Sequence, residues 1–328
     1  MSDITRTPGP LLTLKIDVDT YRGTREGVPN LVRMLRKYNA HATFLFSMGP
    51  DHTGWAMKRI FRPGFFSKVS RTSVLEHYGF KTLMYGVLLP APDISRDAAG
   101  PMKAVAEAGF ECGIHTWDHV RWQDNVRGSG ASWTSAVMRR AEDRFRQVFG
   151  YNAPTFGAAG WQMNNFAFVE HDAAGYAYAS DGRAPLNEDG SLREPQAGPH
   201  RFQGTSCVQL PTTLPTLDEL LGRTINGLTL TRANIAGHLL KLTEGARRDH
   251  VYTLHAELEG QKLSPIFEEL LSGWKAQGYR LASMADYYHK VKNLPLPDYP
   301  VSWGEVPGRS GELIVSAPIA ARPGEPRG

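Results

Sequence analysis

Two histidines four positions apart, His115 and His119 in the segment HTWDH, are the residues of this chain whose spacing best suits metal chemistry. On a helical turn both imidazoles would lie on one face and could bind one metal ion. The alternative is that the pair is a chance spacing of surface or core histidines. A carboxylate ligand is available upstream, because Asp17 and Asp19 lie in the segment KIDVDT. Two imidazoles and one carboxylate leave positions open for water, as in catalytic metal sites.

The second aspartate and a third histidine could divide the acid–base chemistry between them. If the strand continues through Asp19, the side chains of Asp17 and Asp19 point to the same side. One could bind the metal while the other accepts a proton from water, although a turn or cap pair is the alternative. His255 ends the segment VYTLH and could protonate a departing amine, unless it is a core histidine. Asp118, between the two histidines of the pair, is expected to face away.

The motifs of several other mechanisms are absent from the sequence. It contains no Gly-x-Ser-x-Gly elbow, no phosphate loop ending in Gly-Lys and no Gly-x-Gly-x-x-Gly fingerprint. Cys112 falls inside a predicted strand, so we expect no thiol nucleophile. Cys207 is the only other cysteine, which argues against a disulfide framework and for reduced thiols.

Strands and helices alternate along most of the chain. Apolar, β-rich runs predict strands at residues 11–17, 42–48, 110–115, 155–159, 177–181, 208–210, 251–255 and 279–284. Helical periodicity predicts helices at residues 25–38, 97–108, 132–149, 233–242 and 265–277. About eight strands in this rhythm favour an α/β fold with parallel strands, a distorted (β/α) barrel rather than an open sheet. Asp17, Asp19, His115, Asp181 and His255 fall where predicted strands end, which is the catalytic face of a barrel.

An insertion rich in basic and aromatic residues follows the second predicted strand, at about residues 50–95. From residue 51 to 90 it carries six basic residues against two acidic ones. The basic residues are Lys58, Arg59, Arg62, Lys68, Arg71 and Lys81. Cations mixed with aromatic rings suit an anionic membrane surface, although the rings could instead pack on the barrel. No nucleic-acid motif accompanies them, so a nucleic-acid partner is not expected.

The 328 residues fit one barrel with insertions. We expect an N-terminal extension at residues 1–10, the barrel at residues 11–296 and an extended or disordered tail at residues 297–328, which is rich in proline and glycine. The sequence has no secretory signal and no run near the ~20 apolar residues of a membrane span. These features predict a cytoplasmic protein, and the insertion predicts peripheral association with the inner face of the inner membrane.

The order of Asp-Val-Asp, His-Thr-Trp-Asp-His and Tyr-Thr-Leu-His resembles the polysaccharide deacetylase family. That family's NodB-homology domain is a distorted (β/α) barrel that hydrolyses N-acyl or O-acyl groups with one divalent metal ion. The segments IDVDTYRGTREGVP, FSMGPD, AAGW, YASDGR, LPTTLPTLDELLGR and HAELEG are similar to members that remove formyl from formamido-arabinose linked to undecaprenyl phosphate. The resemblance covers residues 11–294.

The resemblance implies a role for each matching residue. Asp17 is similar to the catalytic base, Asp19, His115 and His119 to the metal triad, and His255 to the general acid, while Asp181 falls in the segment whose aspartate orients that acid. In the family an arginine from the fourth-strand segment pairs with the base. That segment is TFGAAGWQ here and Gln162 follows Gly-Trp, so Arg183 is our candidate for the partner of Asp17. The candidate substrate-binding residues are Arg22, Arg25, Trp161 and Arg183, with the arginines directed at a phosphodiester.

The resemblance thus implies a metal-dependent amidohydrolase acting on a polyprenyl-phosphate-linked amino sugar. Its ligand set suits zinc, manganese, cobalt or iron. One alternative is an N-deacetylase of a chitin-like or peptidoglycan glycan, which the missing secretory signal and the insertion disfavour. The other is a non-catalytic polyprenyl-phosphate-binding protein, which the complete set of base, metal ligands and acid disfavours. We infer no protein partner from the sequence.

Overall fold

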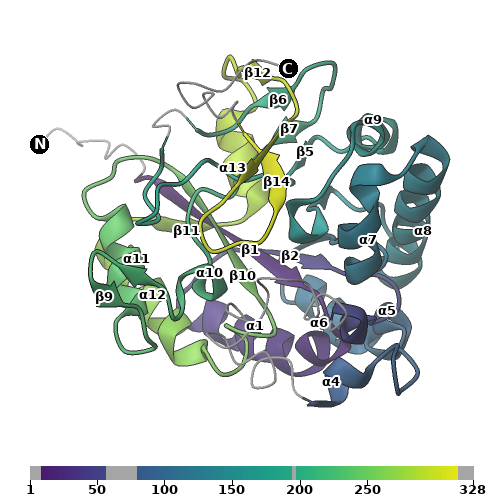
Figure 1. Ribbon diagram of the computed structural model, residues 1–328, viewed down its shortest axis with the longest axis horizontal. Coiled ribbons are helices and arrows are strands. Elements are labelled where there is room, and N and C mark those ends of the chain that lie inside the picture. Colours follow the sequence, from purple (N-terminus) through teal and green to yellow (C-terminus); the bar gives the residue numbers. More distant parts are fainter. Residues whose placement is uncertain (1–8, 57–79, 194–196, 317–328) are drawn as a thin grey trace, which may run out of the picture.

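The computed structural model describes residues 9–56, 80–193 and 197–316, and its centre is a curled sheet of parallel strands (Figure 1). The strands are β1 (Leu11–Val18), β2 (Thr43–Phe46), β3 (Glu111–Ile114), β4 (Thr155–Phe156), β5 (Tyr178–Ala179), β7 (Val208–Gln209), β10 (His250–His255) and β11 (Arg280–Ala282). They pair in the order β10-β1-β2-β3-β4-β5-β7, and β11 also pairs with β1. Thr213, just after β7, donates its backbone N–H to Val251 of β10. The predicted distorted barrel is confirmed.

The central strands are buried along their whole length. All eight residues of β1 are buried, including the charged Lys15 and Asp17, and so are all six residues of β10, including His255. Continuous burial is expected of parallel strands that are covered on both faces. Because ionisable groups at such positions require partners, they indicate where the functional site lies.

Helices surround the sheet, with α11 and α12 on one side and α7, α8 and α9 on the other (Figure 1). The helices are α1 (Val28–Lys37), α4 (Phe80–Met84), α5 (Ile94–Asp97), α6 (Ala99–Glu107), α7 (His119–Asn125), α8 (Ala131–Phe149), α9 (Asn165–Ala174), α10 (Leu217–Leu220), α11 (Ile235–Thr243), α12 (Ser264–Ala276) and α13 (Met284–Val291). The longer helices cover the core with one apolar face. In α1 the buried residues Val28, Leu31 and Leu35 recur at helical spacing.

Several helix boundaries differ from the predicted ones. The helix predicted at residues 25–38 is preceded by a π-helical turn, η1 (Gly23–Gly27). Backbone crowding explains the glycine at the junction, because a Cβ on Gly27 would lie 2.0 Å from the carbonyl oxygen of Ala256. The helix predicted at residues 97–108 is α6, and the short helix α5 that precedes it was not predicted. Helix α13 was not predicted, although Ser283 and Asp286 form a capping box at its start.

Only the two ends of the predicted insertion are described, and Lys58, Arg59, Arg62, Lys68 and Arg71 lie outside the described residues. At the first end, Trp55 stacks on His52 with ring centres 3.8 Å apart and donates its indole N–H to Gly86. This aromatic ring therefore packs within the protein. At the second end, Val87 and Leu88 are 55% and 74% exposed.

The chain after residue 297 is not a loose tail in its described part. β12 (Asp298–Tyr299) pairs with β6 (Arg201–Phe202), while β13 (Ser302–Glu305) and β14 (Glu312–Val315) form a hairpin. The prediction of disorder does not hold as far as residue 316, because the apolar side chains of β14 are buried against the barrel. A second hairpin joins β8 (Thr224–Ile225) and β9 (Leu228–Thr229).

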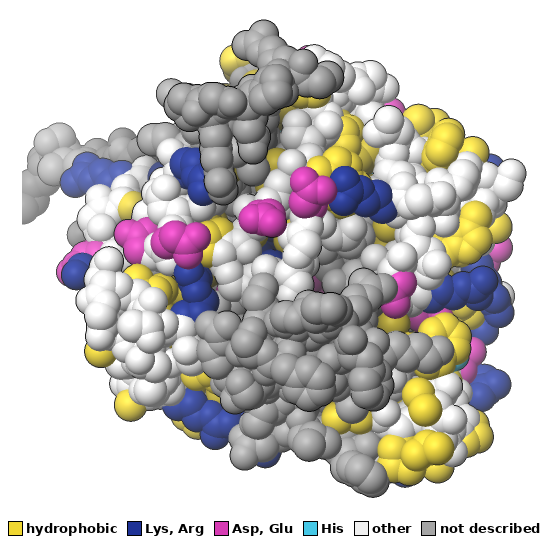
Figure 2. Space-filling model, in the orientation of Figure 1, with side chains coloured by type: hydrophobic (Ala, Val, Ile, Leu, Met, Phe, Trp, Pro, Cys, Tyr) yellow, Lys and Arg dark blue, Asp and Glu magenta, His cyan; other side chains and the backbone are white. Residues whose placement is uncertain are grey.

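The surface in Figure 2 shows acidic and basic side chains next to one another across the middle of one face. In the part of the chain that the structure describes, no helix combines the length and the apolar character required to cross a bilayer.

Candidate active site

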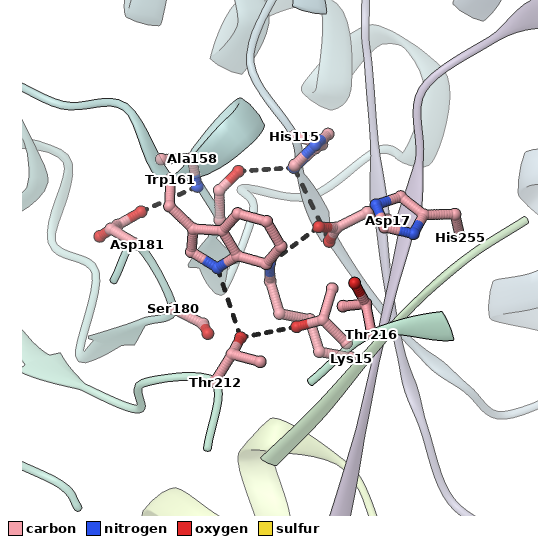
Figure 3. Close-up of polar contacts among 12 residues, drawn as sticks. Lys15, Asp17, His115, Ala158, Trp161, Ser180, Asp181, Thr212, Thr216 and His255 are labelled. Carbon is pink, nitrogen blue, oxygen red and sulfur yellow. Dashed lines mark hydrogen bonds and ion pairs between the residues drawn. The ribbon is translucent and has the colours of Figure 1, made fainter. Parts of the chain in front are cut away.

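Strands β10, β1 and β3 bring the predicted functional residues to one edge of the sheet, with β2 between β1 and β3. Asp17 near the end of β1 lies in register with His255 at the end of β10. His115 directly follows β3, and Asp19 directly follows β1. Parallel strands present their carboxyl ends at the same edge, so segments far apart in the sequence converge there (Figure 3).

Asp19, His115 and His119 form a cluster that could hold a metal ion. Each offers one ligand atom, and the three atoms lie within 4.8 Å of one another. Asp19 Oδ1 is 3.2 Å from His115 Nε2, and Asp19 Oδ2 is 3.5 Å from His119 Nε2. These are the three residues that the sequence assigned to the metal.

The hydrogen bonds of His115 fit a metal ligand. Its Nδ1 lies 2.7 Å from the carbonyl oxygen of Gly157, which can only accept, so Nδ1 carries a proton. In the neutral ring Nε2 then has a lone pair facing a carboxylate oxygen of Asp19 at 3.2 Å. Two acceptors at this distance repel each other unless a cation or a proton lies between them. A backbone carbonyl that orients a histidine in this way is the usual outer partner of a metal-bound imidazole.

The electrostatic surroundings also favour a cation at this cluster. Burial alone would raise the pKa of Asp19, but the imidazoles of His119 and His115 hold it well below its usual range. Burial alone would lower the pKa of His115, but the carboxylates of Asp17 and Asp19 raise it above the ordinary histidine value. The raised pKa of His115 reflects the negative potential of the two carboxylates, and the lowered pKa of Asp19 keeps that carboxylate ionised, as a metal ligand must be.

The two histidines are brought together by a loop rather than by a helical turn. His115 follows β3 and His119 begins α7, so the helical reason for their spacing was wrong. Between them Thr116 has a φ of +69°, a conformation that costs a β-branched residue of order 1–3 kcal/mol. Asp118 faces away, as expected. It caps α7 by accepting from the Arg121 backbone N–H and lies 2.6 Å from His52 Nδ1.

The partner of Asp17 is Lys15, two residues earlier on the same strand. Its ammonium donates to Asp17 Oδ2 at 2.9 Å, and both side chains are buried. Asp17 Oδ1 lies 3.8 Å from His115 Nδ1 (Figure 3). The prediction that Arg183 pairs with Asp17 was wrong. A lysine in β1 replaces the arginine that the family supplies from another strand.

Arg183 instead forms a buried ion pair with Glu219 of α10. Its guanidinium donates to both carboxylate oxygens and to the Leu214 carbonyl oxygen. Trp161 is also buried, with Arg183 4.6 Å and Lys15 5.3 Å from its ring centre. Because both side chains are covered, Arg183 and Trp161 support the walls of the site rather than present a surface to substrate.

Arg22 and Arg25 remain candidates for substrate binding. Both lie shortly after Asp19 in the chain. Arg22 directly precedes η1, Arg25 lies within it, and neither side chain is buried. Arg22 pairs with Glu26 at 2.8 Å, and Arg25 lies over the ring of Tyr21.

The carboxylate beside His255 belongs to Asp218, not to Asp181. Asp218 Oδ1 lies 4.0 Å from His255 Nδ1. Asp181 accepts from the Ala158 backbone N–H and from the Gln209 amide, and Figure 3 shows it on the opposite side of Trp161. The prediction that Asp181 orients the acid was therefore wrong. Sequence position could not separate the two aspartates, since both follow short strands of the same half of the sheet.

Two buried glutamates of the segment HAELEG were missed as functional residues. Glu257 accepts from the backbone N–H groups of Asp19 and Thr20, and from the Thr20 hydroxyl. It therefore holds the loop after β1 that carries Asp19. Glu259 accepts from the His255 backbone N–H at 2.9 Å and so holds the end of β10. Burial raises the pKa of Glu257 well above its usual value and that of Glu259 to about 7. The only signal in the sequence was the alternation of the two acids directly after a buried strand.

Comparisons with known proteins identify the family of this chain. Residues 6–179 match the family model described as polysaccharide deacetylase. A protein of Shewanella sediminis is 32% identical over 301 residues, 92% of each chain, and one of Wigglesworthia glossinidia brevipalpis is 28% identical over 299 residues, 90% of this chain and 99% of that one. Both are named "Probable 4-deoxy-4-formamido-L-arabinose-phosphoundecaprenol deformylase ArnD".

A solved structure supports the fold. A Mycobacterium smegmatis protein described as a polysaccharide deacetylase superposes with a TM-score of 0.57 at 15% identity, covering 92% of this chain and 99% of the other. The matched family model includes the segments that carry Asp17, Asp19, His115 and His119. With its curled parallel sheet and its three-ligand cluster, this chain belongs to the polysaccharide deacetylase family.

Proposed function

We propose that this protein removes the formyl group from 4-deoxy-4-formamido-arabinose linked to undecaprenyl phosphate. The chain is a hydrolase of amide C–N bonds other than peptide bonds, as its family and its relatives indicate. One observation carries the proposed chemistry. A three-ligand cluster, a carboxylate held by a buried lysine and a histidine meet at one end of the sheet. The substrate is proposed from the relatives' names, because the alignments span nearly the whole of both relatives.

Asp19, His115 and His119 would hold a divalent metal ion. When bound, such an ion polarises the amide carbonyl and makes a water molecule more acidic. The residues around it prepare the site. Gly157 orients His115, and Glu257 orients the loop that carries Asp19.

Asp17 is the proposed base. Lys15 holds Oδ2, while Oδ1 accepts no hydrogen bond within the described residues and can accept the proton of the attacking water. The remaining hydroxyl adds to the formyl carbon. His255 is the proposed acid, and it gives its proton to the amine nitrogen as the C–N bond breaks. The products are the free amino sugar and formate, and the proton taken up by Asp17 restores the histidine.

The test is mass spectrometry of the formylated arabinose lipid after incubation with purified, metal-loaded protein. The proposal expects loss of one CO unit from the lipid and release of formate. With the Asp17→Asn variant, the mass of the lipid should stay unchanged. If acetate is released from chitin oligosaccharides while the formylated lipid stays intact, the glycan deacetylase alternative holds. If no acylated substrate turns over with any metal, the protein is a binding protein instead.

Peripheral binding to an anionic membrane is a further part of the proposal. Exposed Val87 and Leu88 lie at the second end of the insertion and could enter the headgroup zone. Replacing Lys58, Arg59, Arg62, Lys68 and Arg71 with glutamine should release the protein from anionic vesicles in a sedimentation assay, while hydrolysis of a short-chain substrate stays nearly unchanged. Binding that survives all five changes would exclude an electrostatic anchor. For one aromatic ring, that of Trp55, packing within the protein already favours the alternative that the rings of the insertion pack on the barrel.

A further inference from the structure

The turn of the C-terminal hairpin places an arginine in the wall of the active site. Arg309 lies between β13 and β14, and its Nε donates to Glu219 at 2.7 Å. Its NH2 lies 3.2 Å from Asp218 Oδ2 and 3.3 Å from Thr216 Oγ1. The guanidinium also lies over Trp161, 4.7 Å from the ring centre. Nε and NH2 of Arg309 thus contact residues of α10 and Thr216 before it, and these contacts fix the plane of the guanidinium.

The hairpin is attached to the barrel independently of this arginine. β14 exchanges backbone hydrogen bonds with Arg183, whose N–H donates to Ile314 and whose carbonyl accepts from Ser316. Gln162 donates to the Glu312 carbonyl oxygen at 2.8 Å. On the outer side, Arg127 pairs with Glu312 at 3.0 Å and stacks on Trp303. The hairpin would therefore stay in place without Arg309, so the contacts of Arg309 are not needed to hold it.

Arg309 controls the carboxylate that faces the proposed acid. Asp218 touches Arg309 on one side and approaches His255 to 4.0 Å on the other. The hairpin turn comes close to α10, because a Cβ on Gly308 would lie 2.5 Å from the carbonyl oxygen of Glu219. Asp218 is part of a short helix of four residues, which has little rigidity of its own. Two contacts from outside the helix orient its carboxylate: the Thr216 hydroxyl donates to Oδ1 at 2.6 Å, and Arg309 lies 3.2 Å from Oδ2.

We infer that Arg309 is a positioning residue that holds Asp218 against His255, so that the C-terminal hairpin completes the acid side of the active site. This inference rests on the proposed hydrolysis. A carboxylate held at the imidazole keeps His255 in the orientation that delivers a proton to the leaving group. Without Arg309, the Asp218 carboxylate loses its cation and keeps the hydrogen bond from the Thr216 hydroxyl, about which it can turn away from His255. Proton delivery then becomes slower while the metal cluster and the base stay intact.

The leaving group of the substrate separates this role from a structural one. An amine leaves an amide only when it is protonated, whereas 4-nitrophenolate leaves an ester without a proton. Loss of acid positioning should therefore slow an amide much more than an aryl ester. A general distortion of the site would slow both alike.

The experiment compares wild type, Arg309→Met, Arg309→Lys and Asp218→Asn, with the formylated arabinose lipid and 4-nitrophenyl acetate as substrates. Arg127→Met is the matched control, because it removes the other arginine that holds the hairpin. We expect Arg309→Met to lower kcat for the formamide by about tenfold with KM within twofold, and to change ester hydrolysis by less than twofold. Arg309→Lys should restore part of the loss, Asp218→Asn should show the same selective loss, and Arg127→Met should resemble the wild type. Metal content and melting temperature, measured on every variant, should match those of the wild type.

Other outcomes would overturn the inference. A rise in KM with kcat unchanged would make Arg309 a substrate-binding residue. Equal losses for amide and ester, or a loss in Arg127→Met as large as in Arg309→Met, would make it a structural clip. If kcat for the formamide is unchanged in Arg309→Met, Arg309 has no role in the reaction. Absence of formamide turnover in the wild type would instead refute the proposed function, and the variants would then be compared on the acylamide that the wild type does hydrolyse.

Discussion

The ion pair between Lys15 and Asp17 predicts a large loss of stability when the lysine is replaced. The two side chains are 0% and 3% exposed, and the charged atoms lie 2.9 Å apart. Coulomb's law with an effective dielectric constant of ~20 gives about 6 kcal/mol for this 2.9 Å separation. Desolvation of both ions cancels much of that attraction, but removal of one partner leaves the other charge buried alone. Such removals cost about 3–5 kcal/mol.

The replacement Lys15→Met keeps most of the apolar stem and deletes only the ammonium. We expect the free energy of unfolding to fall by roughly 3 kcal/mol, because Asp17 then lacks its closest cation. Asp17→Asn removes the stranded charge, so the double variant should lose less than the sum of the two single losses. A coupling free energy of at least ~2 kcal/mol is expected from the double-mutant cycle.

The assay is urea unfolding of metal-depleted protein, so that metal binding does not contribute. Lys37→Met is the matched control, because Lys37 pairs with Glu268 at 3.2 Å but its side chain is 56% exposed. This surface pair should contribute less than about 1 kcal/mol. The reasoning is refuted if Lys15→Met changes stability no more than Lys37→Met, or if the cycle is additive within ~0.5 kcal/mol.

Three further predictions concern the metal, the acid–base pair and acid stability. His115→Ala and His119→Ala should each lower the metal content of the purified protein, measured by elemental analysis, and a chelator should abolish activity; full occupancy in both variants would contradict the triad. Asp17→Asn and His255→Ala should keep their metal but lose at least ~10²-fold in turnover. If either variant keeps the wild-type rate when the chemical step is rate-limiting, the role proposed for that residue is contradicted. Burial lowers the pKa of His200 to about 4, whereas an unfolded histidine titrates near ~6.5, so the unfolded state binds more protons between these values. The stability contributed by His200 is therefore retained above pH ~6.5 and lost as the pH falls toward 4, and the free energy of unfolding should fall by about 2 kcal/mol at pH 5. Urea unfolding at pH 7 and pH 5 should show that His200→Phe removes this loss.

Much of the fold could be predicted because it depends on patterns local to each segment. The alternation of apolar strands with periodic helices predicted the parallel sheet, and every predicted strand is present in the structure, often in shortened form. The C-terminal hairpin was missed because its composition is that of a flexible segment. Its stability depends on burying Leu313, Ile314 and Val315 against a barrel that local patterns do not show.

The candidate metal ligands could be predicted, but their supporting partners could not. Asp19 and His115 directly follow strand ends, and His119 is four residues after His115, which are properties that the sequence reveals. Arg183 was proposed as the partner of Asp17 because it was the arginine available in a neighbouring segment. Its guanidinium turns to Glu219 instead, while Lys15 from β1 occupies the position beside Asp17.

By itself, the sequence determined which residues can do chemistry, the order of the strands that carry them and the family resemblance, because these depend on residue type and on short-range periodicity. Only the tertiary structure decided which charge faces which. Asp181 and Asp218 both follow short strands, yet only Asp218 approaches His255, because curling of the sheet and the turn of the C-terminal hairpin bring α10 toward β10. Ionic partners in a buried site are selected by distances of a few ångströms between segments far apart in the chain. Residue type limits the possible partners, and the packing of the whole barrel selects among them.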